Sequence, residues 1–392
     1  MKHYDWIVVG GGLAGSALSY ELAKVGSSVL LLEQSATPQG ATRYSYGGIA
    51  YWAGDTPMMR QLCQESRALH RNLSAELAAD TEFREINLLL TIDPDRNPEQ
   101  VAAAYAEFMA PPALLSVEAA CALEPLLNAN AIAAVLLFSH GHVSPEAMVK
   151  AYNQAFLNLG GDRQVTRVNS LSPAGVTTSS ETYTSANIAI CAGAMSRSFL
   201  QQAGLSTRLY YTHAEMIETP PLDLRLQAIV MPAEQQRFEM EERAAEVDAL
   251  WDKPNFEVVP AILDVGVVQF QDGSLRIGQI TRALTDLHPQ VDAPESEIAM
   301  RMGIEKILPA LKDVPGKWRS CLVAFSGDRL PLVGAMPQAP SIHLFSGFSN
   351  PFAILPPLAR RFAQQAAGHP DEILRQMSPG RFEAEFKSDN ST

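Results

Sequence analysis

The sequence lacks the patterns that mark metal centres and disulfide-stabilised folds. Its four cysteines are scattered and include no C-x-x-C pair, so neither a zinc site nor a disulfide framework is indicated. The cysteines are Cys63, Cys121, Cys191 and Cys321. The eight histidines show no metal-ligand spacing, and His140 and His142 stand alone. We therefore expect no bound metal.

Long apolar runs and an excess of positive charge are also absent. No run of eighteen or more apolar residues occurs, so no transmembrane helix is indicated. The first apolar strand begins by about residue 5, which leaves no room for a signal peptide or transit segment. A formal charge of −13 argues against non-specific nucleic-acid binding. We expect a cytoplasmic protein, with peripheral membrane contact left open and the oligomeric state undetermined.

The chain does have a glycine-rich turn between two apolar strands. The strand Ile7–Val9 leads into Gly10-Gly11-Gly12-Leu13-Ala14-Gly15, a helix runs to about Lys24, and a second strand ends at Glu33. Gly10 lets the chain turn, Gly12 lets backbone approach a pyrophosphate, and Gly15 lets the helix pack closely on the sheet. The helix N-terminus favours phosphates, and Glu33 is placed to accept ribose hydroxyls. This order predicts a bound dinucleotide with an adenosine end.

Helices and short strands alternate in the first half, and strands dominate from residue 209. Helices are predicted at 58–79, 98–109, 145–159 and 296–308, and strands at 86–91, 131–138, 165–168, 182–191, 209–217, 228–231, 256–263, 265–271, 274–281 and 318–325. Ser144 before Pro145 is a helix-start signature. His140 and His142 are expected in a surface loop. The acidic segment 234–253 is expected to be a solvated helix, a partner-binding surface being the alternative.

Three later segments identify the dinucleotide. Ala192-Gly193-Ala194 follows a strand, Asp328-Arg329-Leu330-Pro331-Leu332-Val333-Gly334 precedes another, and Gly347-Phe348 stands before the last helix. With the opening motif they resemble the FAD-dependent oxidoreductase family of D-amino acid oxidase, glycine oxidase and monomeric sarcosine oxidase. The resemblance is strong at the N-terminus and good over the last seventy residues. In the β-rich middle it rests only on the pattern of predicted strands. It implies that the cofactor is FAD.

The resemblance also implies the architecture. We expect a mixed α/β and α+β fold, in which a Rossmann-like FAD-binding domain is intergrown with a substrate domain built on a mostly antiparallel sheet. The FAD-binding domain would be discontinuous, comprising residues 1–80, 140–205 and 310–392. The substrate domain would comprise residues 81–139 and 206–309.

The resemblance implies which residues of this chain bind the cofactor. A loop from Thr42 to Ile49 matches the segment that runs past the phosphates to the flavin, and Val165 matches the residue whose backbone meets the adenine. Gly347–Pro351 matches the segment at the pyrimidine end of the flavin, where a helix N-terminus favours negative charge. The full set is Gly10, Gly12, Leu13, Ala14, Gly15, Glu33, Gln34, Thr42, Arg43, Gly47, Gly48, Ile49, Val165, Ala192, Gly193, Gly347, Phe348, Ser349, Asn350, Pro351 and Phe352.

The chain departs from the family where a substrate carboxylate is usually held. Amino-acid oxidases of this family carry an arginine five residues before the aspartate of Asp-x-x-Pro, but Val323 stands there. Sarcosine oxidase-like proteins supply a lysine where Ile354 stands, and Asn350-Pro351 replaces a glycine-rich continuation. The substrate therefore differs, or another cation serves. The candidate cations are Arg43, Arg208, Arg276 and His213.

Four further residues match or suggest functional positions. Cys321 has the spacing of a cysteine bonded covalently to flavin in sarcosine oxidase-like enzymes, although a buried structural thiol is the ordinary interpretation. Arg276 matches a basic residue linked to oxygen activation, with an ion pair on a solvated sheet face as the alternative. His213 is the strongest single catalytic candidate, followed by Tyr211, although packing roles compete for both.

We therefore expect an FAD-dependent oxidoreductase that oxidises a small amine, amino acid or related compound by hydride transfer to the flavin. Electrons would pass to oxygen or another acceptor. One alternative is an FAD-dependent 2-hydroxy-acid or polyol dehydrogenase on the same scaffold. The other, motivated by the missing carboxylate-binding cations, is a flavin-containing binding or assembly factor with weak or no catalysis.

Overall fold

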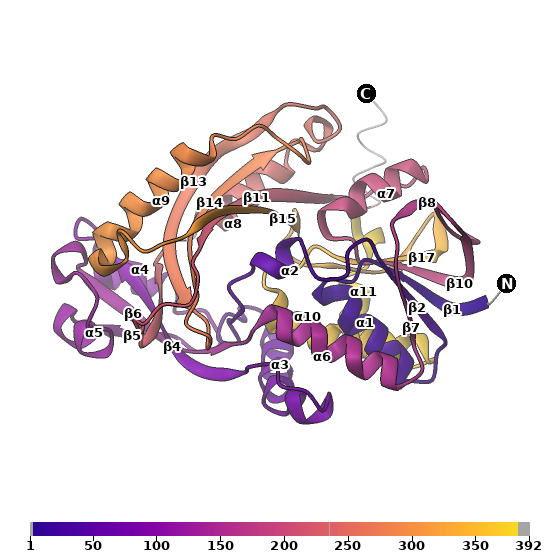
Figure 1. Cartoon of the computed structure of the whole chain (residues 1–392), viewed down its shortest axis with the longest axis horizontal. Helices are drawn as coiled ribbons and strands as arrows, with labels where there is room; N and C mark the ends of the chain where they lie inside the picture. The colour runs from indigo at the N-terminus through magenta and orange to yellow at the C-terminus, as the bar shows by residue number, and fades with distance from the viewer. Residues whose placement is uncertain (1–2, 235, 383–392) are drawn as a thin grey trace.

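A computed structural model describes residues 3–234 and 236–382, which form two large sheets with helices packed around them (Figure 1). The first sheet has the order β16-β17-β10-β1-β2-β7, and a β8–β9 hairpin extends from β10. Its members are β1 (His3–Val9), β2 (Val29–Glu33), β7 (Asp162–Val165), β8 (Val168–Ser172), β9 (Gly175–Thr178), β10 (Thr182–Ile190), β16 (Leu332–Met336) and β17 (Ala339–Ser346). Strands β7, β2, β1, β10 and β17 are parallel.

Strands β1, β2 and β10 carry apolar runs toward their carboxyl ends because both faces of the sheet are covered there. Trp6 and Val8 pack toward the helical layer, whereas Ile7 and Val9 pack on the opposite face beside the β8–β9 hairpin and α7. The helical layer comprises α1 (Leu13–Lys24), α3 (Pro57–Glu76), α6 (Pro145–Asn158) and α10 (Pro351–Ala366), and α7 is Ser196–Gln202. Ser144 caps α6 by accepting a hydrogen bond from the Ala147 N–H, as its sequence predicts.

The second sheet has the order β15-β11-β14-β13-β12-β4-β6-β3, with β5 paired to β6. Its pairs are antiparallel except for β12 with β4, which agrees with the expected mostly antiparallel sheet. The strands are β3 (Gly48–Ile49), β4 (Arg84–Ile92), β5 (Ala113–Leu115), β6 (Ala134–His142), β11 (Leu209–Glu218), β12 (Ala228–Pro232), β13 (Glu257–Gln269), β14 (Leu275–Leu284) and β15 (Lys317–Ser326). Helices α5 (Val117–Leu123) and α9 (Ala293–Ile307) share an apolar cluster with this sheet.

The remaining elements are short. They are α2 (Ala41–Tyr44), α4 (Pro98–Ala103), α8 (Gln236–Ala245), α11 (Glu372–Gln376) and the 3₁₀ turns Ala129–Ala131, Gly193–Met195, Asp248–Leu250, Pro309–Leu311 and Pro379–Phe382. No helix within residues 3–234 and 236–382 is long and apolar enough to cross a membrane. The predicted domain division at residue 310 stays a prediction, but β15 pairs along its length with β11 of the second sheet.

Some predicted boundaries are wrong for tertiary reasons. The helix predicted at 98–109 ends at Ala103, because Tyr105 and Phe108 turn in to pack around Phe138 and Trp52. The strands predicted at 256–263 and 265–271 form one irregular strand, β13. The segment predicted as a strand at 165–168 is instead the junction between β7 and β8.

The two histidines predicted in a surface loop lie on a strand. Residues 139–142 continue β6, which pairs with β4 from Ala134 to His142 and with β3 at its end. His140 and His142 are 6% and 1% exposed. The prediction failed because the partners of residues 139–142 lie more than 50 residues away along the chain, and a local pattern does not reveal them.

The acidic segment is not a fully solvated helix either. One face of α8 buries Met240, Glu241, Ala244 and Ala245, and its apolar members pack in a cluster with Tyr210 and Trp251. The opposite face carries the exposed charges that made the segment appear solvated. This packing holds α8 beside the principal cavity of the molecule, which Arg237 and Phe238 line.

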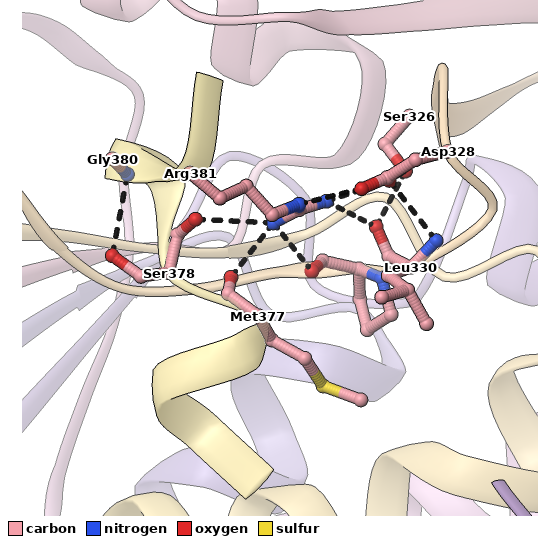
Figure 2. A network of polar contacts seen from close by, with 8 residues as sticks. Ser326, Asp328, Leu330, Met377, Ser378, Gly380 and Arg381 are labelled. Carbon is pink, nitrogen blue, oxygen red and sulfur yellow. Dashed lines mark hydrogen bonds and ion pairs between the residues drawn. The ribbon is translucent and has the colours of Figure 1, made fainter. Parts of the chain in front are cut away.

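Polar contacts of Arg381 hold the loop between β15 and β16 in place (Figure 2). Arg381 makes a bidentate ion pair with Asp328, with Nε–Oδ2 and Nη2–Oδ1 distances of 2.7 and 2.8 Å. Its guanidinium also donates to the carbonyls of Leu330 and Met377 at 2.7 and 2.9 Å. The C-terminal 3₁₀ turn therefore fastens the Asp328 loop, which lines the cavity.

Candidate active site

A cavity of about 1890 Å³ is lined by residues of both sheets. One end is formed by the carboxyl ends of β1 and β2 and by the N-terminus of α1, and the other by strands of the second sheet. Helix α10 begins between these regions, with Gly347–Phe352 along the wall. Ligands bind at the carboxyl ends of parallel strands in such sheets, so this cavity is the candidate active site.

The glycine turn has no room for side chains. Gly10 has φ of +102°, and a Cβ built on it would lie 2.6 Å from the Cys191 carbonyl oxygen. A Cβ on Gly15 would lie 1.8 Å from the carbonyl oxygen of Gly10. Leu13 N–H donates to Thr42 Oγ1 at 3.0 Å, and Gly12 offers no side-chain cap to α1. The turn therefore brings the N-terminus of α1 to the cavity without side-chain bulk, an arrangement that suits a pyrophosphate.

The acidic residue at the end of β2 is held in place. Glu33 accepts hydrogen bonds from the Gly11 N–H at 2.6 Å and the Ser35 N–H at 3.0 Å. Glu33 and Gln34 both line the cavity beside the turn. Val165 does not line it, and its side chain is 52% exposed. Thr166, Arg167 and Val168 line the cavity instead, so the wall at this point lies just beyond the predicted position.

Most other predicted cofactor residues line the same cavity. These are Gly10, Gly12, Leu13, Ala14, Thr42, Gly48, Ala192, Gly193, Gly347, Phe348, Ser349, Asn350, Pro351 and Phe352. Gly15, Gly47 and Ile49 lie behind the lining, where Gly15 packs on the turn and Ile49 is fully buried in the helical layer. These residues fit FAD, since the glycine cradle admits phosphates and the wall continues to the N-terminus of α10.

Two predicted arginines face a second cavity of about 1100 Å³. Arg43 forms ion pairs with Glu146 at 3.2 Å and with Glu218 at 2.6 Å, so its charge is already balanced. Arg276 is 5% exposed, donates to the Ser45 carbonyl and lies 4.3 Å from the Phe270 ring centroid. Burial lowers the pKa of Arg276 to about 10, with Arg43 adding to the effect. Arg276 is therefore not on a solvated face.

Of the two predicted catalytic residues on β11, one lines the principal cavity. His213 lines it, and its Nε2–H donates to the Asp286 carbonyl at 2.8 Å. Burial lowers the pKa of His213, which favours the neutral ring. Tyr211 is buried outside the lining, and its hydroxyl donates to the Thr285 carbonyl at 2.5 Å. Tyr211 therefore braces the sheet.

His140 lines the cavity, although it was assigned to a loop. Trp52 Nε1–H donates to His140 Nδ1 at 3.0 Å, and burial lowers the pKa of His140 to about 3. A neutral ring that accepts at Nδ1 must carry its proton on Nε2. Nε2 lies beside Gly48, where a Cβ would approach it to 2.8 Å. The site therefore contains a fixed neutral N–H donor.

The cations expected from the family are absent at their usual positions, and two other arginines line the cavity. Val323 and Ile354 line the cavity as apolar residues, and so does Cys321. Burial raises the pKa of the Cys321 thiol to about 12. Arg237 and Arg329 also line the cavity. Arg329 is paired with Glu242 at 2.6 Å, whereas Arg237 has no ion-pair partner within the described ranges.

Arg237 lies beside the segment that leads into α10. Its Nη2 donates to the Ser349 carbonyl at 3.5 Å, and the Ser349 hydroxyl contacts Glu241 Oε2 at 3.4 Å. Burial raises the pKa of Glu241, and Arg237 opposes the rise. The sequence did not indicate Arg237 as a site residue, because Arg237 stands in the acidic segment that was interpreted as a solvated helix. A group of His, Cys, Asp or Glu able to hold a metal is not found among the described residues.

Comparisons with known proteins agree with this geometry. Residues 5–365 match the family model DAO, described as FAD dependent oxidoreductase. A glycine oxidase from Bacillus licheniformis is 27% identical over 227 residues, which cover 55% of this chain and 61% of that protein. That match spans less than two thirds of the relative's length.

Solved structures show the same fold. Glycine oxidase from Geobacillus kaustophilus superposes with a TM-score of 0.79 at 20% identity, covering 97% of this chain and 99% of that one. L-proline dehydrogenase from P. horikoshii gives 0.79 at 19% identity, covering 98% and 99%. These identities are low, so the likeness is one of architecture.

Proposed function

Because the chain belongs to the DAO family of FAD-dependent oxidoreductases, we propose that it oxidises a small amino acid or related amine by hydride transfer to FAD, with Arg237 holding the substrate carboxylate. FAD supplies the hydride acceptor, and the protein supplies binding, orientation and exclusion of water. The family relative from Bacillus licheniformis and the solved structure from Geobacillus kaustophilus are named glycine oxidases, which supports an amino acid as substrate.

The observation that carries the proposal is the position of Arg237. It is a half-buried cation without an ion-pair partner within the described ranges, and it lines the cavity beside the α10 N-terminus. A guanidinium presents paired N–H donors that match a carboxylate, and partial desolvation strengthens this interaction. Arg237 of α8 can therefore bind the substrate carboxylate, which Val323 of β15 cannot do.

The wall around the flavin segment suits the reduced cofactor. Gly347–Phe352 leads into the first turn of α10, whose N-cap Asn350 makes no side-chain capping bond. Free N–H groups at a helix N-terminus favour negative charge nearby. The electron acceptor after reduction is oxygen or another oxidant. Solved structures with this fold include proteins named oxidases and one named a dehydrogenase.

Anaerobic mixing of the FAD-loaded protein with a panel of substrates tests the proposal. The panel contains amino acids, simple amines and 2-hydroxy acids, and bleaching of the oxidised flavin absorbance reports reduction. We expect reduction by one or more amino acids. Reduction by hydroxy acids alone would support the dehydrogenase alternative, and reduction by no member of the panel would contradict catalysis on these classes.

A variant pair tests Arg237 itself. Arg237→Met should raise KM for the amino acid about 10- to 100-fold, because a charge-assisted interaction contributes roughly 1.5–3 kcal/mol. Arg237→Lys should recover part of the loss. Arg375→Met is the matched control, since Arg375 lies on α11, is 65% exposed and is outside the cavity lining. An unchanged KM in Arg237→Met would exclude this carboxylate grip.

A further inference from the structure

The second sheet presents many apolar side chains to the cavity, and its two middle strands add polar ones between them. Residues of β11, β12 and β4 on this surface include Ala214, Met216, Ile229, Met231, Leu88 and Leu90. Between β11 and β12 lie β14 and β13, which contribute Gln279 and Asp264. A carboxylate in an apolar wall loses hydration, so it needs a partner of opposite charge or several donors.

A break in strand register places these two side chains together. On β13 and β14, Leu263 pairs with Ile280 and Gly266 pairs with Gly278, so two residues of β13 stand opposite Gln279. The register between β14 and β11 also shifts at Gln279. Bulges re-aim side chains and are common beside active sites. Here the irregularity brings Asp264 and Gln279 to the same wall of the cavity.

The Asp264 carboxylate has no bonded partner within residues 3–234 and 236–382. Arg237 is the nearby positive charge, Glu234 and Tyr46 are the other titratable groups that interact with it, and Glu234 is itself paired with Arg96 at 2.8 Å. Burial raises the pKa of Asp264 to about 6, which leaves it mostly ionised at pH 7. Gln279 donates to Thr281 Oγ1 at 2.8 Å, and its amide oxygen stays available as an acceptor.

We propose that Asp264, supported by the Gln279 amide oxygen, binds the amino group of the substrate and makes the enzyme selective for amino acids over the corresponding hydroxy acids. This inference rests on the proposed oxidation of an amino acid. Arg237 and Asp264 together offer one cation and one anion within a single cavity, which complements a zwitterion. The wall offers several acceptors, and an amino group supplies two or three N–H donors where a hydroxyl supplies one.

The test compares three ligands in the FAD-loaded protein. They are the amino acid that reduces the flavin fastest, its 2-hydroxy-acid counterpart, and the carboxylate that lacks either group. Dissociation constants come from perturbation of the flavin spectrum, and KM and kcat come from steady-state turnover. Asp264→Asn should weaken binding of the amino acid about 10- to 100-fold, whereas binding of the plain carboxylate should change less than threefold.

Two more variants sharpen the result. Asp264→Ser also removes the carboxylate and should show the same selectivity, so the inference does not depend on one variant folding. Asp223→Asn is the matched control, because Asp223 is exposed and outside the cavity lining. It should leave all three affinities unchanged.

The outcomes distinguish the amino-group site from the proposed oxidation of an amino acid. If amino acids reduce the flavin but the Asp264 variants weaken all three ligands equally, or weaken none, the amino-group site is overturned and the proposed function stands. If amino acids neither reduce the flavin nor perturb its spectrum, both are overturned.

Discussion

Replacing Trp52 with Phe should disturb the cavity through a single hydrogen bond. The indole ring of Trp52 stacks on Phe138 with a centroid distance of 3.8 Å and meets Phe108 edge-on at 5.5 Å. A phenyl ring can keep both contacts. What it cannot replace is the Nε1–H that His140 Nδ1 accepts at 3.0 Å. The substitution therefore leaves a buried acceptor without its donor.

The expected cost follows from that unpaired atom. An unsatisfied buried acceptor lowers the unfolding free energy by about 1–3 kcal/mol, measured by urea denaturation. The ring stays neutral, because burial holds the pKa of His140 near 3. Its proton, however, is no longer confined to Nε2. Nitrogen-15 NMR of histidine-labelled protein should show a shift of His140 from the Nε2–H tautomer toward a mixture.

Trp251→Phe is the matched control for this prediction. Trp251 is also buried, and its Nε1–H donates to the Ala244 carbonyl at 2.8 Å, outside the cavity lining. The control should lose comparable stability without changing the His140 tautomer. A Trp52→Phe protein with unchanged stability, or with His140 still wholly in the Nε2–H form, would refute the assignment of the donor.

Three other predictions concern the glycine turn, the buried histidine His70 of α3 and the Cys321 thiol. Gly15→Ala should weaken FAD binding more than tenfold in titrations of the apoprotein, because its Cβ would lie 1.8 Å from the Gly10 carbonyl oxygen; equal affinity would contradict the cradle. Burial lowers the pKa of His70 to about 4, so the unfolded state takes up the proton first, and stability falls as pH drops below 6.5. His70→Gln should reduce the loss of unfolding free energy between pH 7 and pH 5 by up to about 2 kcal/mol, and an identical pH slope would exclude this origin. Denaturation should release FAD from the polypeptide, because burial keeps Cys321 protonated, and colour retained on the chain would show a covalent link.

The end of the cavity at the glycine turn could be located from the sequence because its constraints are local. The glycine turn, the helix after it and Glu33 lie within about thirty residues, and each requirement acts on backbone that is close in sequence. The Gly347–Phe352 segment is similar, since a helix start is a local signal. The predicted contact of the Val165 backbone with adenine stays a prediction. Which residue of a strand end lines the cavity depends on the pairing of β7 with β2, and that register is a long-range property.

The second-sheet side of the cavity was not predictable, because its residues meet only through sheet pairing. His140 comes from β6, Gln279 from β14 and Asp264 from β13, and none carries a motif of its own. The only local trace of Asp264 was a gap, since two strands were predicted with a break at that position. The break is in fact a bulge within one strand. A polar residue at an interruption of an apolar strand was the signal that could have found it.

The position of the cation changes what the site can select. An arginine at position 323 would stand on β15, whose neighbours on β11 are fixed along ten paired residues. Arg237 instead projects from α8, which is anchored by a few buried residues on one face. Asp264 stays on the sheet, so the distance between the two charges depends on how α8 sits over the cavity. A substrate that spanned both charges would stabilise one placement of the helix, and its affinity would reflect both contacts less the free energy of fixing that placement.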